Sequence, residues 1–300
     1  MRISQEAITA STTRRLNRRL EDLAEVQTQL GTGRRILTPS DDPAGANRIL
    51  LMRGDMKSRL QEERNAEDGK TWVDLGDTKL QDANTLLQRA RDLAVRGSQT
   101  IPQDERDAIA GELTQIRDQL VAVANSKHLG RGLFAGYSAG DAVSFNGGTN
   151  QWEYTGTAAP APVQRRISQS DTVQVNVLAD DAFGFTNGPG GDMFSMIDDL
   201  AADVRAGDLD GASAGIGRVD DAMEDVLGSV ATLGATQNRI DLALDRNMAE
   251  QLSLKTQMSS VEDVDLAEGI MNLQTQEVAY KATLGALSRA IQPSLVDFLG

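Results

Sequence analysis

Apolar residues near both ends of the chain recur at alternating steps of four and three, which is the spacing of a coiled-coil seam. Over residues 262–300 such a stripe is interrupted only by Glu277. Over residues 1–35 a second stripe has the same spacing, with Gln27 as its polar position. We therefore expect an assembly seam formed by Leu16, Leu20, Leu23, Leu30, Leu266, Ile270, Leu273, Tyr280, Leu284, Leu287 and Ile291.

The two ends carry opposite net charge. Residues 1–35 contain seven Lys or Arg and four Asp or Glu, a net of +3, whereas residues 262–300 contain two and six, a net of −4. This complementarity favours pairing of the two ends, although the periodicity equally allows each helix to pack separately on a globular core. Ordering a long segment costs conformational entropy, and burial of one apolar stripe between two helices offsets only part of that cost. We therefore expect the ends to become ordered within an assembly.

Capping signals predict long helices between the ends. Gly31-Thr32-Gly33 is a typical helix end, and Ser40-Asp41-Asp42-Pro43 is a typical helix start, with acidic caps before proline. Helical stripes separated by turn residues supply the remaining boundaries. The predicted helices cover about residues 5–30, 43–96, 103–126 and 193–205, then a run from about 211 that is interrupted at 259–265 and restarts behind an acidic cap.

From Gly130 the sequence pattern changes to glycine-rich turns and to apolar and polar residues that alternate with a period of two. Strands are predicted at 143–145, 152–154 and 172–178, with a hairpin turn at 146–148. The predicted fold class is mainly α: a long antiparallel helical rod with coiled-coil terminal helices and a small antiparallel β insert. We expect three domains: a terminal coiled-coil domain (1–39 and 263–300), a helical rod domain (40–135 and 192–262) and a β-rich outer insert (136–191).

Composition excludes several classes of function. The net charge of −14 argues against general nucleic-acid binding. Without cysteine the chain has neither disulfides nor thiolate chemistry, and its single histidine, His128, is expected at the surface of a turn. No apolar run is long enough for a membrane span, and the first residues show no cleaved secretory signal. We predict no catalytic, cofactor-binding or metal site, and therefore no enzyme.

Two stretches resemble a known family. Arg34-Arg35-Ile36 followed by Ser40-Asp41-Asp42-Pro43 resembles the N-terminal region of the flagellin family, and Val261–Glu268 resembles its C-terminal signature. The final residues, 292–299, are more similar to hook-associated junction members of the family than to filament members. The resemblance covers roughly residues 1–130 and 195–300.

The resemblance implies a structural protein of the extracellular flagellum, exported by the flagellar type III channel without a cleaved signal peptide. Its implied partners are copies of itself in a ring, a neighbouring hook-associated junction protein, flagellin, and an export chaperone for the C-terminal helix. The terminal helices would form the inner tube of the assembly. Filament flagellin is the nearer alternative, and a cytosolic coiled-coil scaffold is the more distant one.

Overall fold

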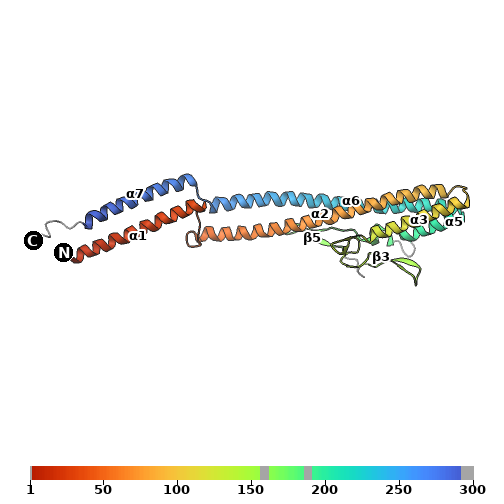
Figure 1. Ribbon diagram of the computed structural model, residues 1–300, viewed down its shortest axis with the longest axis horizontal. Helices are drawn as coiled ribbons and strands as arrows, with labels where there is room; N and C mark the ends of the chain where they lie inside the picture. Colours follow the sequence, from red (N-terminus) through yellow and green to blue (C-terminus); the bar gives the residue numbers. More distant parts are fainter. Residues whose placement is uncertain (1, 156–161, 186–190, 292–300) are drawn as a thin grey trace, which may run out of the picture. The chain divides into compact units, whose positions relative to one another are not determined.

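A computed structural model describes residues 2–155, 162–185 and 191–291, with the side chains of 2–9, 287 and 289–291 left aside (Figure 1). The described residues form seven helices and three pairs of short antiparallel strands, which confirms the predicted mainly helical class. The chain divides into two compact units, Met1–Ser58 with Glu250–Gly300 and Arg59–Ala249. The three-domain division remains a prediction.

The first unit contains α1 (Arg2–Thr32), the start of α2 (Pro43–Gly97), the end of α6 (Leu209–Glu262) and α7 (Leu266–Ile291). Its predicted helices are present with bounds within about three residues of the prediction, although α6 continues through Ser259 and Ser260 to Glu262. Gly33 follows α1 in the left-handed conformation, with φ of +72°. The Asp42 carboxylate accepts the Gly45 N–H at 2.9 Å at the start of α2, and Asp265 accepts the Ala267 N–H at 2.8 Å at the start of α7.

Helices α1 and α7 run side by side along their length (Figure 1). The Arg19 guanidinium donates to the Gln276 side-chain oxygen at 3.3 Å across this pair. The prediction that the two ends of the chain pair with one another is therefore confirmed, and packing of each end on a separate globular core is not what the structure shows.

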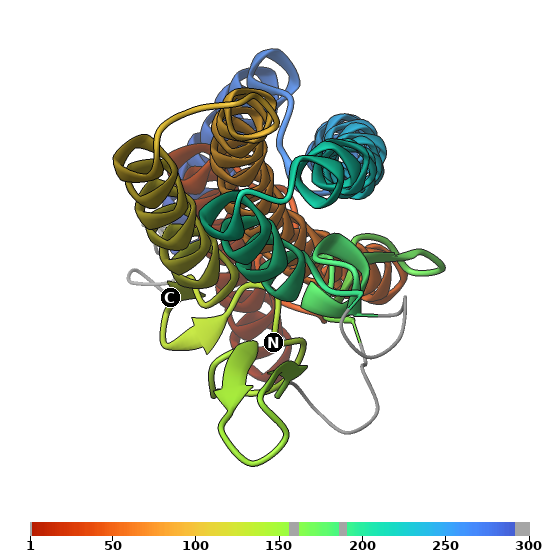
Figure 2. The ribbon, with the colours of Figure 1, turned by 90° about the vertical axis from the view of Figure 1, so that its right-hand side faces the viewer.

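The second unit is built on antiparallel α2 and α6, which are joined by ion pairs of Arg91 with Asp220 and of Lys70 with Asp241, each at 2.6 Å. Helix α3 (Gln103–Ala124) folds back along α2, and α5 (Met193–Ala206) packs on α3. Figure 2 shows the four helices nearly end-on, with the strands on the side of α3 and α5. Helix α2 is continuous through its internal glycines, and Gly76 packs closely on α6, where the Leu233 Cδ1 would lie 3.1 Å from an added Cβ.

The strands form three separate hairpins. The hairpin predicted around residues 146–148 is confirmed, with Phe145 opposite Trp152. The strand predicted for 172–178 is wrong beyond Gln174, because the Asn176 side chain accepts the Val163 N–H at 2.7 Å and replaces a ladder partner. The pairs are β1 (Lys127–His128) with β2 (Arg131–Gly132), β3 (Val143–Asn146) with β4 (Gln151–Tyr154), and β5 (Gln164–Arg166) with β6 (Thr172–Gln174), followed by the short helix α4 (Ala179–Ala182).

A single apolar core occupies the second unit. Phe134, Phe183 and Phe194 are buried at its centre, with the ring centroids of Phe134 and Phe183 5.4 Å apart. Val143 and Val173 from the strand region join the same core as the helices. The β segments are thus part of the packing of this unit.

His128 does not lie on the surface of a turn, as the sequence predicts. It is in β1, half-buried, and its ring meets Trp72 of α2 edge-on at 5.5 Å between centroids. The pattern missed this contact because it depends on where α3 returns the chain along α2. The histidine thereby attaches the β1–β2 hairpin to the helices.

Candidate assembly surfaces

The contact face of the terminal pair uses only part of the predicted seam. Gly269 of α7 lies close to α1, where an added Cβ would approach the Leu30 Cδ2 to 2.7 Å. Around this contact several seam side chains are half-buried, as expected for a two-helix interface exposed to water at its rim. These half-buried seam residues are Leu16, Leu23, Leu30, Leu273 and Tyr280.

A second group of apolar side chains, all on α7, is exposed at the edge of this contact. Leu266 is 58% exposed, Ile270 50% and Leu284 39%, although all three belong to the predicted seam. At 100° per residue they lie beside Leu273 and Tyr280 on the helix circumference. Helix α7 is therefore apolar over a wider arc than α1 covers.

Further apolar side chains extend this uncovered surface. Val278 is 67% exposed and Met271 61%, and on α1 the seam residue Leu20 is also exposed. Several exposed apolar side chains on one helix are typical of a contact with another protein. The remaining seam residues, Leu287 and Ile291, have side chains outside the described set. The role of the whole seam in assembly remains a prediction.

The linkers that join the terminal pair to α2 and α6 hold each other across the chain. Arg34 and Asp263 form an antiparallel β-bridge, with the Arg35 N–H donating to the Glu262 carbonyl at 2.7 Å. The Val264 N–H donates to the Gly33 carbonyl at 3.0 Å. Backbone hydrogen bonds therefore fix where the two terminal helices begin.

Glu262 is the charged centre of this junction. Its carboxylate is only 9% exposed, and one oxygen accepts from Arg34 Nε at 3.0 Å and from Arg53 Nη2 at 2.9 Å. Two guanidinium groups balance the buried charge, which would otherwise be costly. From the sequence, the acidic cluster at 262–265 is predicted only to cap a helix. No local sequence signal shows that Glu262, rather than its acidic neighbours, is the buried residue.

The loop before α2 is organised by two carboxylates. The Asp41 side chain accepts the Thr38 hydroxyl at 2.7 Å and the backbone N–H groups of Thr38 and Leu37. These hydrogen bonds stabilise the carboxylate and lower the pKa of Asp41, with the Thr38 hydroxyl as the largest cause. The Gly45 N–H in the same way lowers the pKa of Asp42.

The described residues show neither a metal-binding cluster nor a membrane-spanning helix. No group of three or more His, Asp or Glu side chains within 2–155, 162–185 and 191–291 is arranged to hold a metal ion. Over the same part of the chain, no helix is long and apolar enough to cross a membrane.

Comparison with known proteins identifies the family. The family model of the bacterial flagellin N-terminal helical region matches residues 3–139, and that of the C-terminal helical region matches residues 216–299. The chain belongs to the bacterial flagellin family. It is accordingly an exported structural component of the bacterial flagellum that assembles with other flagellar proteins.

Relatives within the flagellin family include both filament and hook-associated proteins. Flagellin of Bacillus subtilis is 26% identical, with 97% of each chain covered. Flagellar hook-associated protein 3 of Escherichia coli is also 26% identical, with 87% of each chain covered.

Solved structures of the same fold include hook-associated proteins. FlgL of Xanthomonas campestris gives a TM-score of 0.61 at 20% identity, covering 69% of this chain and 99% of that one. The flagellar junction protein FlgL of Legionella pneumophila gives 0.59 at 14% identity, covering 72% of this chain and 100% of that one. At these identities the likeness concerns the fold alone.

Proposed function

We propose that this flagellin-family protein is a junction protein between a hook-associated protein and the flagellin filament. The observation that carries the proposal is the exposed apolar surface of α7, with Leu266, Ile270 and Val278 each at least half exposed. Exposed apolar side chains on a helix that already has one partner require further partners. A ring of identical subunits supplies them.

Two similarities favour a role at the junction over a role in the filament. The final residues, 292–299, resemble hook-associated members of the family, and the solved structures cited above are FlgL proteins. The partners proposed are therefore copies of this chain, the neighbouring hook-associated protein on one side and flagellin on the other. We further propose export without a cleaved signal peptide, with a chaperone on the C-terminal helix before assembly, and no enzymatic activity.

Filament flagellin is the second candidate, favoured by the match to Bacillus subtilis flagellin over 97% of each chain. Deletion of the gene distinguishes the two roles. If the protein is a junction protein, cells without its gene should release filament protein into the medium, and their hooks should lack filaments. If deletion removes the filament protein itself, or leaves filaments attached, the junction role is wrong. Electron microscopy of labelled protein on isolated flagella should place it in a short band beside the hook.

A further inference from the structure

Strand β3 ends in an asparagine that is followed by glycine. Asn146-Gly147 is the one such pair in the part of the chain that the structure describes, and Asn187-Gly188 lies outside that part. Before glycine, an asparagine loses its side-chain amide most readily, because glycine has no Cβ to keep its nitrogen away from the side-chain carbonyl carbon. Whether this chemistry is favoured depends on how the turn holds the two groups.

The turn folds the asparagine side chain over the nitrogen that would attack it. The Asn146 Oδ1 accepts the Gly148 N–H at 2.9 Å, in the turn that asparagine forms with the backbone two residues on. This ring encloses the Gly147 peptide, so the side-chain carbonyl lies beside the Gly147 nitrogen, and the same hydrogen bond polarises that carbonyl. Within the described residues the Gly147 N–H makes no hydrogen bond, and Gly147 is exposed.

The amide group that would leave also links the two strands of the hairpin. The Asn146 Nδ2 donates to the Glu153 Oε1 at 2.8 Å, and the Thr149 hydroxyl donates to the same oxygen at 3.0 Å. A carboxylate in place of the amide can still accept the Gly148 N–H, but it faces Glu153 with the same charge. Like charges on neighbouring strands destabilise the pairing of the strands.

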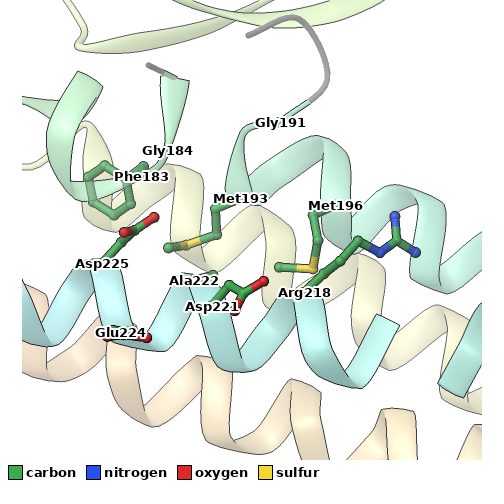
Figure 3. Close-up of a pocket in the computed structure, with 10 residues that line it drawn as sticks. All are labelled: Phe183, Gly184, Gly191, Met193, Met196, Arg218, Asp221, Ala222, Glu224 and Asp225. Carbon is green, nitrogen blue, oxygen red and sulfur yellow. The ribbon is translucent and has the colours of Figure 1, made fainter. Parts of the chain in front are cut away.

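The hairpin is attached to α5 through Trp152. Its indole N–H donates to the Asp198 Oδ2 at 3.2 Å, and its ring lies 5.6 Å from that of Phe194 between centroids. Met193 and Met196 of α5 are only 2% and 5% exposed, and Figure 3 shows both directed toward α6. The base of the hairpin is therefore well packed, so a change in the turn should loosen β3 and β4 and leave the helices in place.

We propose that Asn146 is a site of spontaneous deamidation that loosens the β3–β4 hairpin as the protein ages. The Gly147 nitrogen loses its proton to solvent and forms a bond to the Asn146 Cγ. The Cγ–Nδ2 bond breaks, and the amide nitrogen takes up a proton and leaves as ammonia. Water then opens the cyclic imide to aspartate or isoaspartate, so one water is consumed and one ammonia is released.

Both products disturb the hairpin. Each places a carboxylate near Glu153, and isoaspartate also carries the backbone through the side-chain carbon, which adds an atom to the turn. A subunit exported into the flagellum no longer meets the repair enzymes of the cytoplasm, so the products accumulate with time. The inference applies to a junction protein and to a filament protein alike, because it concerns only the hairpin of one subunit.

Peptide mass spectrometry of the full chain stored at neutral pH tests the site, with a fresh sample as zero time. Trypsin releases residues 132–165, which contain Asn146 and Asn150 but not Asn187. Asn146 should convert while Asn150, which precedes glutamine, stays intact. Gly147→Ala is the matched variant, because an added Cβ meets nothing within 4 Å and the φ of Gly147 is not positive, so the fold should persist while most of the conversion is lost. Equal conversion in both proteins, or none at Asn146, overturns the proposal.

Trp152 reports the loosening of the hairpin, because the other tryptophan, Trp72, is only 3% exposed in the core. Asn146→Asp should shift tryptophan emission to longer wavelength and accelerate amide exchange in β3 and β4, and Glu153→Gln added to it should reverse both effects. Stored wild-type protein should approach the behaviour of Asn146→Asp, whereas stored Gly147→Ala should not. Unchanged emission and exchange in Asn146→Asp would contradict the proposed loosening.

Discussion

Leu30 of α1 lies directly against Gly269 of α7, where an added Cβ would come within 2.7 Å of the leucine Cδ2. Glycine is usually unfavourable inside a helix, so this position trades helix propensity for close approach of the two terminal helices. The contact fixes the register of α7 along α1.

Enlarging this glycine should separate the terminal pair. Gly269→Leu is expected to cost the pair roughly 1–3 kcal/mol through overpacking and to lower incorporation into flagella. Gly54→Leu, at an exposed position inside α2, is the control, because an added Cβ there meets nothing within 4 Å. Both changes gain the same helix propensity, so equal incorporation of the two variants would show that the Leu30 contact is not limiting.

The buried carboxylate of Glu262 should be needed to hold the two linkers together. Glu262→Gln keeps the shape but removes the charge shared by Arg34 and Arg53. Because both guanidinium groups are about half exposed, the expected loss is only roughly 1–2 kcal/mol. Amide hydrogen exchange of Arg35 and Val264 should accelerate accordingly. Glu268→Gln, an exposed acid nearby, should leave that exchange unaltered.

The helices could be predicted from sequence because their signals are local. Gly33 ends α1 and Asp42 begins α2 through contacts with residues at most three positions away. The bridge between Arg34 and Asp263 joins residues far apart in the chain, so no local pattern contains it. Likewise the seam pattern identifies which residues of α7 are apolar but not which arc faces α1.

The strand region was harder to predict for a related reason. The ladder after β6 stops where Asn176 binds Val163, a side-chain choice that alternation cannot show. The β1–β2 turn has leucine where the expected turn signal is Asn-Gly. Both features become visible only once distant segments are packed together.

The loop before α2 should lose stability in acid. The folded-state pKa values of Asp41 and Asp42 lie below the ordinary 3.8, so their stabilising contribution is present above that value. It is lost as the pH falls through the lowered folded pKa values. The amide resonances of Leu37 and Thr38 should therefore shift together below pH 3.8, measured by nuclear magnetic resonance. Asp41→Asn should abolish this transition, and a transition above 3.8 would contradict the account.

The two ends of the free subunit should exchange faster than the helices of the second unit. Dilute monomer is expected to show fast amide exchange over residues 1–35 and 265–300 and protection over 43–126 and 212–258. The reason is that α7 packs on α1 and leaves much of its apolar arc exposed, whereas the buried face of α2 belongs to the core of the second unit. Mass spectrometry resolves these segments. Equal protection of the ends in dilute monomer would mean that they need no assembly to become stable.

The central claim is that the exposed apolar arc of α7 is an assembly surface, and a single charge within it tests this most directly. Ile270→Asp places a carboxylate on a side chain that is half exposed in the subunit, and Thr275→Asp places the same charge on an exposed polar position of α7 outside that arc. In an assembled contact, burying an unpaired charge costs several kcal/mol. The measurement is the amount of each variant protein in isolated flagella. Circular dichroism of the purified variants is the folding control. The account predicts that both variants fold and are exported, and that only Ile270→Asp is lost from flagella; equal incorporation of both would contradict it.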